Sequence, residues 1–351
     1  MTATSGFVPS TPEQVAMPGV PALDEALRQA CGADSSPHVT ALHRLKRNVY
    51  RAEVHGGGHI RSLVLKGSDP ALAYHNLLVA RRWLPAVGMS HAAARLVGTV
   101  ADRRGEHVWL LYEDLGDSSL EQTPCDRRRT GVAVDLAAEL HLRSSGNPIL
   151  PECRVHGGDL GAAYLSANLS DAINGLERLS PPRVTLTPER QIVRDRLLAR
   201  LCILQNELTA RIAMLAAAGG PEVLLHGDLW RTNVFVHDAP DGRGPRARFV
   251  DWDHAGVGPV CYDLSTLLLR FPTAERHWIL ERYREAVAQA GWRLPAAPDL
   301  NRLFATAEYA RYANRVVWPV VALLVDRAEW AFDELAMVAG WFDSFAPVLP
   351  E

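Results

Sequence analysis

The first third of the chain alternates apolar and polar side chains, as a β-strand does when one of its faces is buried. Residues 49–55 and 60–66 follow this pattern and are separated by Gly56-Gly57-Gly58, so they predict a β-hairpin. Residues 107–112 predict a further strand. We therefore expect this part of the chain to be rich in strands.

A helix is predicted between these strands. Asp69 and Pro70 precede an apolar run, and Asp is a common N-cap residue while Pro is favoured in the first helical turn. This helix is expected to run to about residue 84 and to stop at Pro85. A shorter helix is expected at 21–30, after a Pro-, Ser- and Thr-rich start that has little to bury.

Apolar residues recur at helical spacing beyond the polar stretch 113–117. Thr187 caps a long predicted helix, and strands are predicted at 222–225 and in a second hairpin of 234–237 with 248–251. The last predicted helix has one apolar face made of Leu324, Ala328, Ala331, Leu335, Val338 and Phe342. The pattern indicates an α+β protein, with a strand-rich third followed by a helix-rich remainder.

Composition narrows the class of protein. The 351 residues are 48% hydrophobic and 22% charged, which is typical of a globular protein and not of a disordered chain or a coiled coil. A net charge of −3 argues against bulk binding of nucleic acid or anionic membrane. Neither a signal peptide nor a membrane span is recognised, and the five cysteines are scattered, so we expect a cytoplasmic protein.

Three polar residues near the second hairpin have the spacing of a phosphoryl-transfer site. Asp228 and Asn233 lie between the strands at 222–225 and 234–237, and Asp251 ends the strand at 248–251. One carboxylate would accept the proton of an attacking hydroxyl. The amide and the second carboxylate would hold Mg²⁺ through the hard oxygens that this ion prefers.

The segments around these residues, HGDLWRTN at 226–233 and FVDWD at 249–253, resemble those of the aminoglycoside phosphotransferase and choline kinase group. The resemblance implies a bilobal protein-kinase-like fold, with a small β-rich N-lobe and a larger, mainly helical C-lobe. After a flexible tail at 1–20, the expected bounds are 21–114 for the nucleotide-binding N-lobe and 115–351 for the C-lobe.

The same resemblance assigns roles to individual residues. Asp228 would be the catalytic base, and Asn233 and Asp251 would bind Mg²⁺. Lys66 would contact the phosphates of ATP or GTP, and Lys46 and Lys66 are the only lysines among 37 basic residues. Glu113 and Leu115 lie in a stretch that resembles the hinge whose backbone binds adenine. Asp263 would brace the catalytic loop.

Two family features are missing from this sequence. Residues 43–48, which correspond to the nucleotide loop, contain no glycine, and there is no glutamate between Glu53 and Glu106 to pair with Lys66. Lys46 or Arg47 could contact phosphates instead, and His75 or Asn76 could orient Lys66. These departures keep open the alternative of a catalytically silent, nucleotide-binding pseudokinase or regulatory protein.

A binuclear metal-dependent phosphoesterase is the alternative chemical interpretation of these residues. Its metal ligands would be His226, Asp228, Asp251, Asp253 and His254. This hypothesis accounts for neither Lys66 nor the hinge-like stretch. We expect His226 instead to pack its ring and to hold the loop through backbone hydrogen bonds.

The acceptor is expected to be a hydroxyl group of a small molecule. An aminoglycoside or another antibiotic, a sugar, an amino alcohol or a nucleoside is each compatible with the motifs, and the oligomeric state is open. Two patterns are noted for a cationic acceptor, each with a plain structural alternative. They are an acidic helix face of Asp326, Glu329 and Asp333, and a possible aromatic cage of Tyr309, Tyr312, Trp318 and Trp330.

Overall fold

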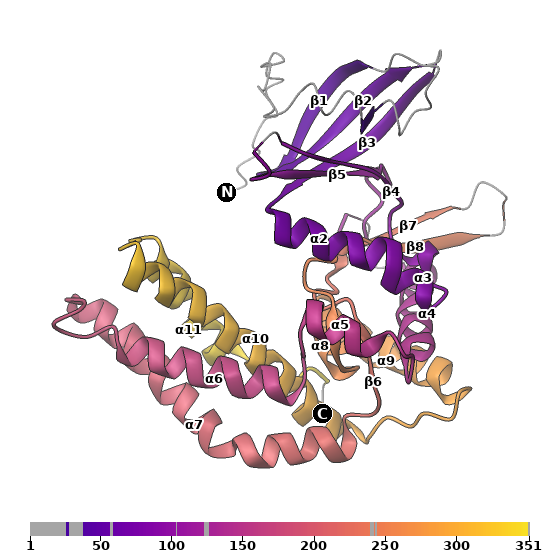
Figure 1. Ribbon diagram of the computed structural model, residues 1–351. Coiled ribbons are helices and arrows are strands. Elements are labelled where there is room, and N and C mark those ends of the chain that lie inside the picture. Colours follow the sequence, from indigo (N-terminus) through magenta and orange to yellow (C-terminus); the bar gives the residue numbers. More distant parts are fainter. Residues whose placement is uncertain are drawn as a thin grey trace, which may run out of the picture. The chain divides into compact units, whose positions relative to one another are not determined.

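A five-stranded antiparallel sheet and a larger, mainly helical part make up the computed structural model of the chain (Figure 1). The described residues are 26–27, 38–56, 59–102, 104–122, 126–238, 242 and 244–349. The expected tail at 1–20 lies outside them, and of the helix expected at 21–30 only Ala26 and Leu27 are described, in helical conformation. The chain divides into two units, Met1–Arg82 with Ala93–Gly116, and Trp83–Ala92 with Asp117–Glu351.

The sheet of the first unit has the strand order β1-β2-β3-β5-β4. Its strands are β1 (His38–Lys46), β2 (Val49–Gly56), β3 (His59–Ser68), β4 (Leu96–Ala101) and β5 (Val108–Glu113). The predicted hairpin is therefore present as β2 and β3, and the strand predicted at 107–112 is present as β5. The turn between β1 and β2 is only two residues long, because Lys46 pairs directly with Val49.

One face of this sheet is covered by a small apolar core. Its members are Ala26, Leu27, Ala52, Val54, Leu63, Leu65, Trp109 and Leu111. Successive side chains of a strand point to opposite faces. Because Leu65 is buried in the core, Lys66 lies on the other face, where it is directly opposite Val49 on one side and Leu110 on the other.

The predicted helix after Asp69 begins as expected, since the Asp69 carboxylate accepts the Leu72 N–H at 3.0 Å. Its course differs from the prediction. The α-helix α2 (Pro70–Leu78) passes into a π-helical turn at Val79–Trp83 and then into the short helix α3 (Leu84–Ala86). Pro85 thus lies inside a helix instead of stopping one. It is the second residue of α3, directly after the π-helical turn.

The second unit is mainly helical. Its longer elements are α4 (Arg127–Ser144), α5 (Leu150–Gly157), α6 (Ala162–Glu177), α7 (Pro188–Ala218), α8 (Cys261–Leu269), α9 (Thr273–Ala288), α10 (Ala297–Val325) and α11 (Ala331–Ser344). Leucine, alanine, valine and phenylalanine side chains of α6, α7, α10 and α11 form one core cluster. Figure 1 shows α6 and α10 running side by side.

The helix α7 is the one described helix that is long and apolar enough to cross a membrane on length and composition alone. Thr187 caps it as predicted, with its hydroxyl 3.4 Å from the Arg190 N–H. Leu197, Leu201 and Leu204 are buried in the core of the second unit. Only 11% of its apolar stretch is buried, and one such helix is weak evidence for a membrane span.

Two short ribbons lie among these helices. They are β6 (Glu222–Leu225) with β9 (Gly256–Pro259), and β7 (Val234–Asp238) with β8 (Pro245–Phe249). The strand expected at 222–225 is confirmed. The strand expected at 248–251 ends earlier, at Phe249, so Asp251 lies in the loop after it.

The prediction of a single final helix across residues 324–342 is wrong. The chain leaves α10 at Val325, and Arg327 has a left-handed backbone with φ 55°, which cannot continue a right-handed helix. The N–H groups of Asp326 and Ala328 both donate to the Ala322 carbonyl. The acidic face expected on this helix is therefore also absent. Glu329 lies before α11 and pairs with Arg190 at 2.5 Å.

Candidate active site

The loop that follows β6 is held by one buried carboxylate. Asp263, in the first turn of α8, accepts the His226 N–H at 2.8 Å and the Gly227 N–H at 2.9 Å. Two backbone donors with no helix or strand partner are thereby satisfied inside the protein. The bracing role expected for Asp263 is confirmed.

Asp263 is in turn oriented by α4 and α9. The His141 Nε2 lies 3.3 Å from an Asp263 oxygen, and the His141 Nδ1 lies 2.8 Å from the Tyr283 hydroxyl. Burial alone would raise the pKa of Asp263, but the hydrogen bond and charge of His141, with the His226 N–H, lower the pKa on balance. The carboxylate is thus kept ionised as an acceptor for the loop.

His226 is part of the loop's packing. Its ring lies 4.6 Å from that of Trp252, its Nε2 is 3.0 Å from the Val250 carbonyl, and its Nδ1 accepts the Asp228 N–H at 3.3 Å. Burial lowers the pKa of His226 despite the nearby carboxylates, so the ring is neutral. Both ring nitrogens are engaged, which confirms the packing role and removes His226 as a ligand of a binuclear metal site.

Gly227 lets the loop approach the segment after β8. Its φ of 83° is in the left-handed region, and a Cβ built there would lie 1.8 Å from the His254 carbonyl oxygen. Glycine is required at this position for both reasons. The loop and the segment that carries Asp251 are therefore in direct contact.

Asp228 and Asn233 are connected directly. The Asn233 Nδ2 donates to the Asp228 carbonyl at 2.9 Å and lies 3.3 Å from the Asp228 Oδ2. A tight turn at Arg231–Asn233 brings the amide back to the aspartate five residues earlier. With the amide nitrogen so engaged, the Asn233 Oδ1 is the atom left to act as a metal ligand.

Asp251 lies next to Asn233, because the Val250 N–H donates to the Asn233 carbonyl at 2.9 Å. Asp251 itself has φ 66°, in the left-handed region that Asp and Asn adopt more readily than other non-glycine residues. Asn233 and Asp251 supply an amide oxygen and a carboxylate, the donor set that Mg²⁺ prefers. The structure thus brings Asp228, Asn233 and Asp251 together at one end of the β7–β8 ribbon.

The other three predicted site residues lie in the first unit. Lys66 is half-buried on β3, Glu113 ends β5, and Leu115 follows in a half-buried loop. Glu113 and Arg95 exchange two hydrogen bonds, from the Glu113 N–H to the Arg95 carbonyl at 2.9 Å and from the Arg95 N–H to the Glu113 carboxylate at 2.8 Å. The hinge-like stretch is therefore anchored within the sheet.

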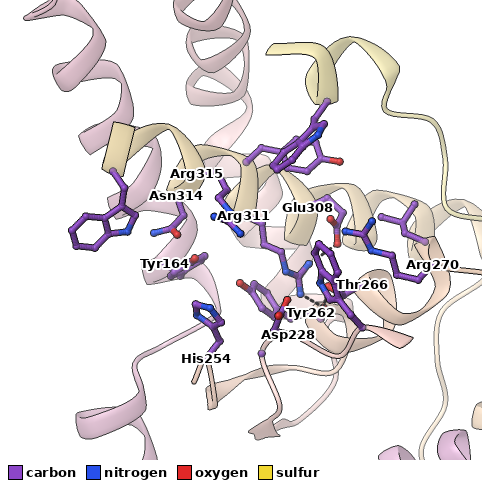
Figure 2. Close-up of a pocket in the computed structure, with 16 residues that line it drawn as sticks. Tyr164, Asp228, His254, Tyr262, Thr266, Arg270, Glu308, Arg311, Asn314 and Arg315 are labelled. Atoms are coloured by element: carbon purple, nitrogen blue, oxygen red, sulfur yellow. Dashed lines mark hydrogen bonds and ion pairs between the residues drawn. The ribbon is translucent and has the colours of Figure 1, made fainter. Parts of the chain in front are cut away.

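A cavity of about 560 Å³ opens beside Asp228 in the second unit. Figure 2 shows residues of its wall coming from the catalytic loop, α8 and α10. It is lined by Tyr164, Gly227, Asp228, Trp230, His254, Tyr262, Thr266, Leu269, Arg270, Glu308, Arg311, Tyr312, Asn314, Arg315, Trp318 and Trp341. The volume is that of a typical small-molecule site.

The sequence predicted only some of the residues that line this cavity. Tyr312 and Trp318 line the cavity, whereas Tyr309 stacks on Phe342 at 5.9 Å and Trp330 is not a lining residue. Arg270, Arg311 and Arg315 were not anticipated. The one usable signal was the helical spacing of the polar residues from Glu308 to Arg315.

Arg311 lines the cavity and forms an ion pair with Glu308. Its guanidinium donates to Glu308 and to the Tyr262 carbonyl and lies 3.6 Å from the centre of the Tyr262 ring. Ser265 donates to the same Glu308 carboxylate at 2.7 Å. Burial alone would lower the pKa of Arg311, but Glu308 and its neighbours raise the pKa, so the guanidinium stays ionised.

Comparison with known proteins agrees with this geometry. The sequence profile of the phosphotransferase enzyme family matches residues 43–300. The chain belongs to this family. It is a phosphotransferase with an alcohol group as acceptor, a small-molecule kinase, and the family and fold expected from the motifs are confirmed.

Solved structures of other members share the fold. Aminoglycoside phosphotransferase APH(3'')-Id from Streptomyces rimosus, in complex with ADP and streptomycin, is 18% identical, with a TM-score of 0.50 over 85% of this chain and 98% of that chain. Macrolide 2'-phosphotransferase MphH from Brachybacterium faecium is 17% identical (TM-score 0.52; 85% and 91% covered). Ethanolamine kinase from Plasmodium vivax is 12% identical (TM-score 0.53; 85% and 80% covered). No curated protein sequence matches the chain.

Proposed function

We propose that this phosphotransferase moves the γ-phosphoryl group of ATP, or of GTP, to a hydroxyl group of a small molecule, with Mg²⁺ as the metal. The observation that carries the proposal is the position of Asp228. Its carboxylate is tied to Asn233 at 3.3 Å and borders a cavity large enough for a small molecule. A phosphoryl acceptor in that cavity would present its hydroxyl to this carboxylate.

In the proposed reaction Asp228 is the base. The acceptor oxygen forms a bond to the γ-phosphorus, the bond from that phosphorus to the nucleotide's bridging oxygen breaks, and the hydroxyl proton passes to Asp228. The hydrogen bond from Asn233 holds the carboxylate in one orientation. Orientation of the attacking hydroxyl is the main contribution expected of the protein, because phosphoryl transfer asks little covalent chemistry of it.

Asn233 and Asp251 would hold Mg²⁺. When bound, the ion neutralises charge on the transferring phosphate. The left-handed backbone of Asp251 and the hydrogen bond between Val250 and Asn233 fix the two ligand residues next to each other before any ion binds. Such preorganisation lowers the cost of assembling the site.

The nucleotide would be held by Lys66 and by the backbone of Glu113 and Leu115. ADP in the Streptomyces rimosus relative supports a nucleotide co-substrate for the fold. The segment proposed to lie over the phosphates includes a two-residue turn without glycine between Lys46 and Val49. Lys46 and Arg47 lie at this turn and would supply positive charge.

Thermal unfolding with ATP and with GTP, each with and without Mg²⁺, tests the proposal. A ligand that binds only the folded state raises the melting temperature, and we expect the largest rise with nucleotide and Mg²⁺ together. Asp251→Asn should abolish the Mg²⁺-dependent part of the rise. Asp238→Asn, at an exposed end of the same ribbon, is the matched control and should leave it intact.

The outcome also separates the alternatives. No rise with either nucleotide would contradict the proposal. A rise that Mg²⁺ does not change, with no nucleotide turnover, would favour the silent pseudokinase suggested by the absence of glutamate between Glu53 and Glu106. Turnover followed by phosphorus NMR would identify whether a phosphate ester is formed.

A further inference from the structure

The charges around the acceptor cavity point away from a cationic substrate. Among its lining residues the acids are Asp228 and Glu308, and the arginines are Arg270, Arg311 and Arg315. Glu308 and Arg311 neutralise each other in a buried ion pair. With Asp228 reserved as the proposed base, the remaining fixed charges are two guanidinium groups.

Neither of these guanidinium groups has a counter-charge among the described residues. Arg315 makes no hydrogen bond or ion pair there, and Arg270 makes only a cation–π contact, with its Cζ 3.5 Å from the centre of the Trp230 ring. Figure 2 shows Arg315 beside Arg311 on α10, with Arg270 on another part of the wall. An arginine at the edge of a cavity with free donors is suited to bind a carboxylate or a phosphate.

The rest of the cavity wall is rich in aromatic side chains. Six aromatic side chains line the cavity, namely Tyr164, Tyr262, Tyr312, Trp230, Trp318 and Trp341. Trp318 is 66% exposed, and it lies three residues after Arg315, on the same side of α10. Trp318 and Arg315 therefore offer a ligand an apolar ring face and a guanidinium group on the same side of α10.

From these observations we propose that the acceptor is a hydroxylated molecule with a ring-bearing apolar body and an anionic group, and not a polycation. The ring lies among the indoles and phenols, the anionic group binds Arg315 and Arg270, and the hydroxyl reaches Asp228. This inference rests on the proposed function, because it assigns the substrate class of the same site. It excludes streptomycin, the ligand named for the Streptomyces rimosus relative, as an acceptor of this chain.

A charge-matched set of probes tests the proposal. Phenyllactate, phenyllactamide and phenylalaninol share a phenyl ring and an aliphatic hydroxyl but are negative, neutral and positive, while lactate keeps the charge without the ring. Binding is followed by the fluorescence of the tryptophans that line the cavity, with Mg²⁺ and a non-hydrolysable nucleotide present. We expect phenyllactate to bind about tenfold or more tightly than phenylalaninol, lactate and streptomycin.

Variants of α10 connect the preference to the named residues. Arg315→Gln should reduce the preference for phenyllactate, and Arg315→Glu should reverse it in favour of phenylalaninol. Arg302→Gln changes an exposed arginine of the same helix that does not line the cavity, and it should leave the preference unchanged. Arg270→Gln is a second, independent test, because it removes the other guanidinium from a different helix end.

Three results would overturn the inference. They are tighter binding of phenylalaninol or streptomycin, no binding of phenyllactate at millimolar concentration, and arginine variants that weaken nucleotide binding while leaving probe preference unchanged. Failure of the proposed function looks different. In that case phenyllactate binds with the expected preference, yet neither nucleotide is bound or turned over.

Discussion

His141 and Asp263 form a hydrogen-bonded pair, Nε2 to Oδ2 at 3.3 Å, in which neither side chain has any exposed surface. Through this pair the position of α4 determines that of the catalytic loop, because Asp263 accepts the two loop N–H groups that follow β6. A buried carboxylate with several donors is stabilising only while all of them are present.

We therefore expect Asp263→Asn to destabilise the protein by about 3–5 kcal/mol. The substitution removes a charge from a buried pair, and it places an NH₂ group near the His226 and Gly227 N–H groups, which are themselves donors. The free energy of unfolding in urea measures this. The control is Asp299→Asn, an exposed acid in the first turn of α10, which should cost at most about 1 kcal/mol. Equal effects of the two substitutions would contradict the bracing role.

The neutral, buried ring of His226 makes stability depend on pH. Burial lowers the pKa of His226 below its ordinary value of 6.5. Below that pH, His226 is therefore protonated in the unfolded chain more readily than in the folded chain. Stability should fall as the pH drops below 6.5, with a slope from this group of at most about 1.4 kcal/mol per pH unit.

Melting temperature measured from neutral to mildly acidic pH tests this. His226→Asn should lose part of the slope, whereas His277→Asn, an exposed histidine on α9, should keep it. The lowered pKa of Asp263 adds a second loss of stability, at pH values below the ordinary carboxyl value of 3.8. A His226→Asn variant with the full slope of the unmodified chain would refute the assignment.

Gly227 offers a prediction with a close internal control. Gly227 and Gly291 both have φ 83°, but a Cβ at Gly227 would meet the His254 carbonyl oxygen at 1.8 Å, while at Gly291 nothing lies within 4 Å. Gly291→Ala should cost only the left-handed strain of about 1–2 kcal/mol. Gly227→Ala should cost more and should also abolish turnover, because the loop must move. Similar unfolding free energies for both variants would show that the contact is not restrictive.

The proposed base gives the most direct kinetic prediction. Asp228→Asn should lower kcat by about 10²–10⁴-fold, the usual contribution of a general base, with little change in nucleotide affinity. Turnover of Mg²⁺-nucleotide, including the slow reaction with water, is the measurement. Asp238→Asn serves again as the control on the neighbouring ribbon. Retention of full activity in Asp228→Asn would eliminate this residue as the base.

Local sequence determined the features that depend on few neighbouring residues. The N-caps Asp69 and Thr187, the alternation of β2 and β3, the strand Glu222–Leu225 and the spacing of Asp228 from Asn233 were all readable, since each is set by hydrogen bonds and burial within one or two elements. The segments 226–233 and 249–253 carry the family resemblance. They were sufficient to predict a small-molecule kinase.

Tertiary structure alone decided the rest. The break between α10 and α11 depends on Arg327 taking a left-handed backbone, which nothing in its residue type requires. The acceptor cavity joins Tyr164, Trp230, Arg270, Arg315 and Trp341, which come from five separate segments. Their proximity, and hence the charge the cavity presents to a substrate, arises from helices packed across long sequence separations, and a single sequence carries no local signal of such packing.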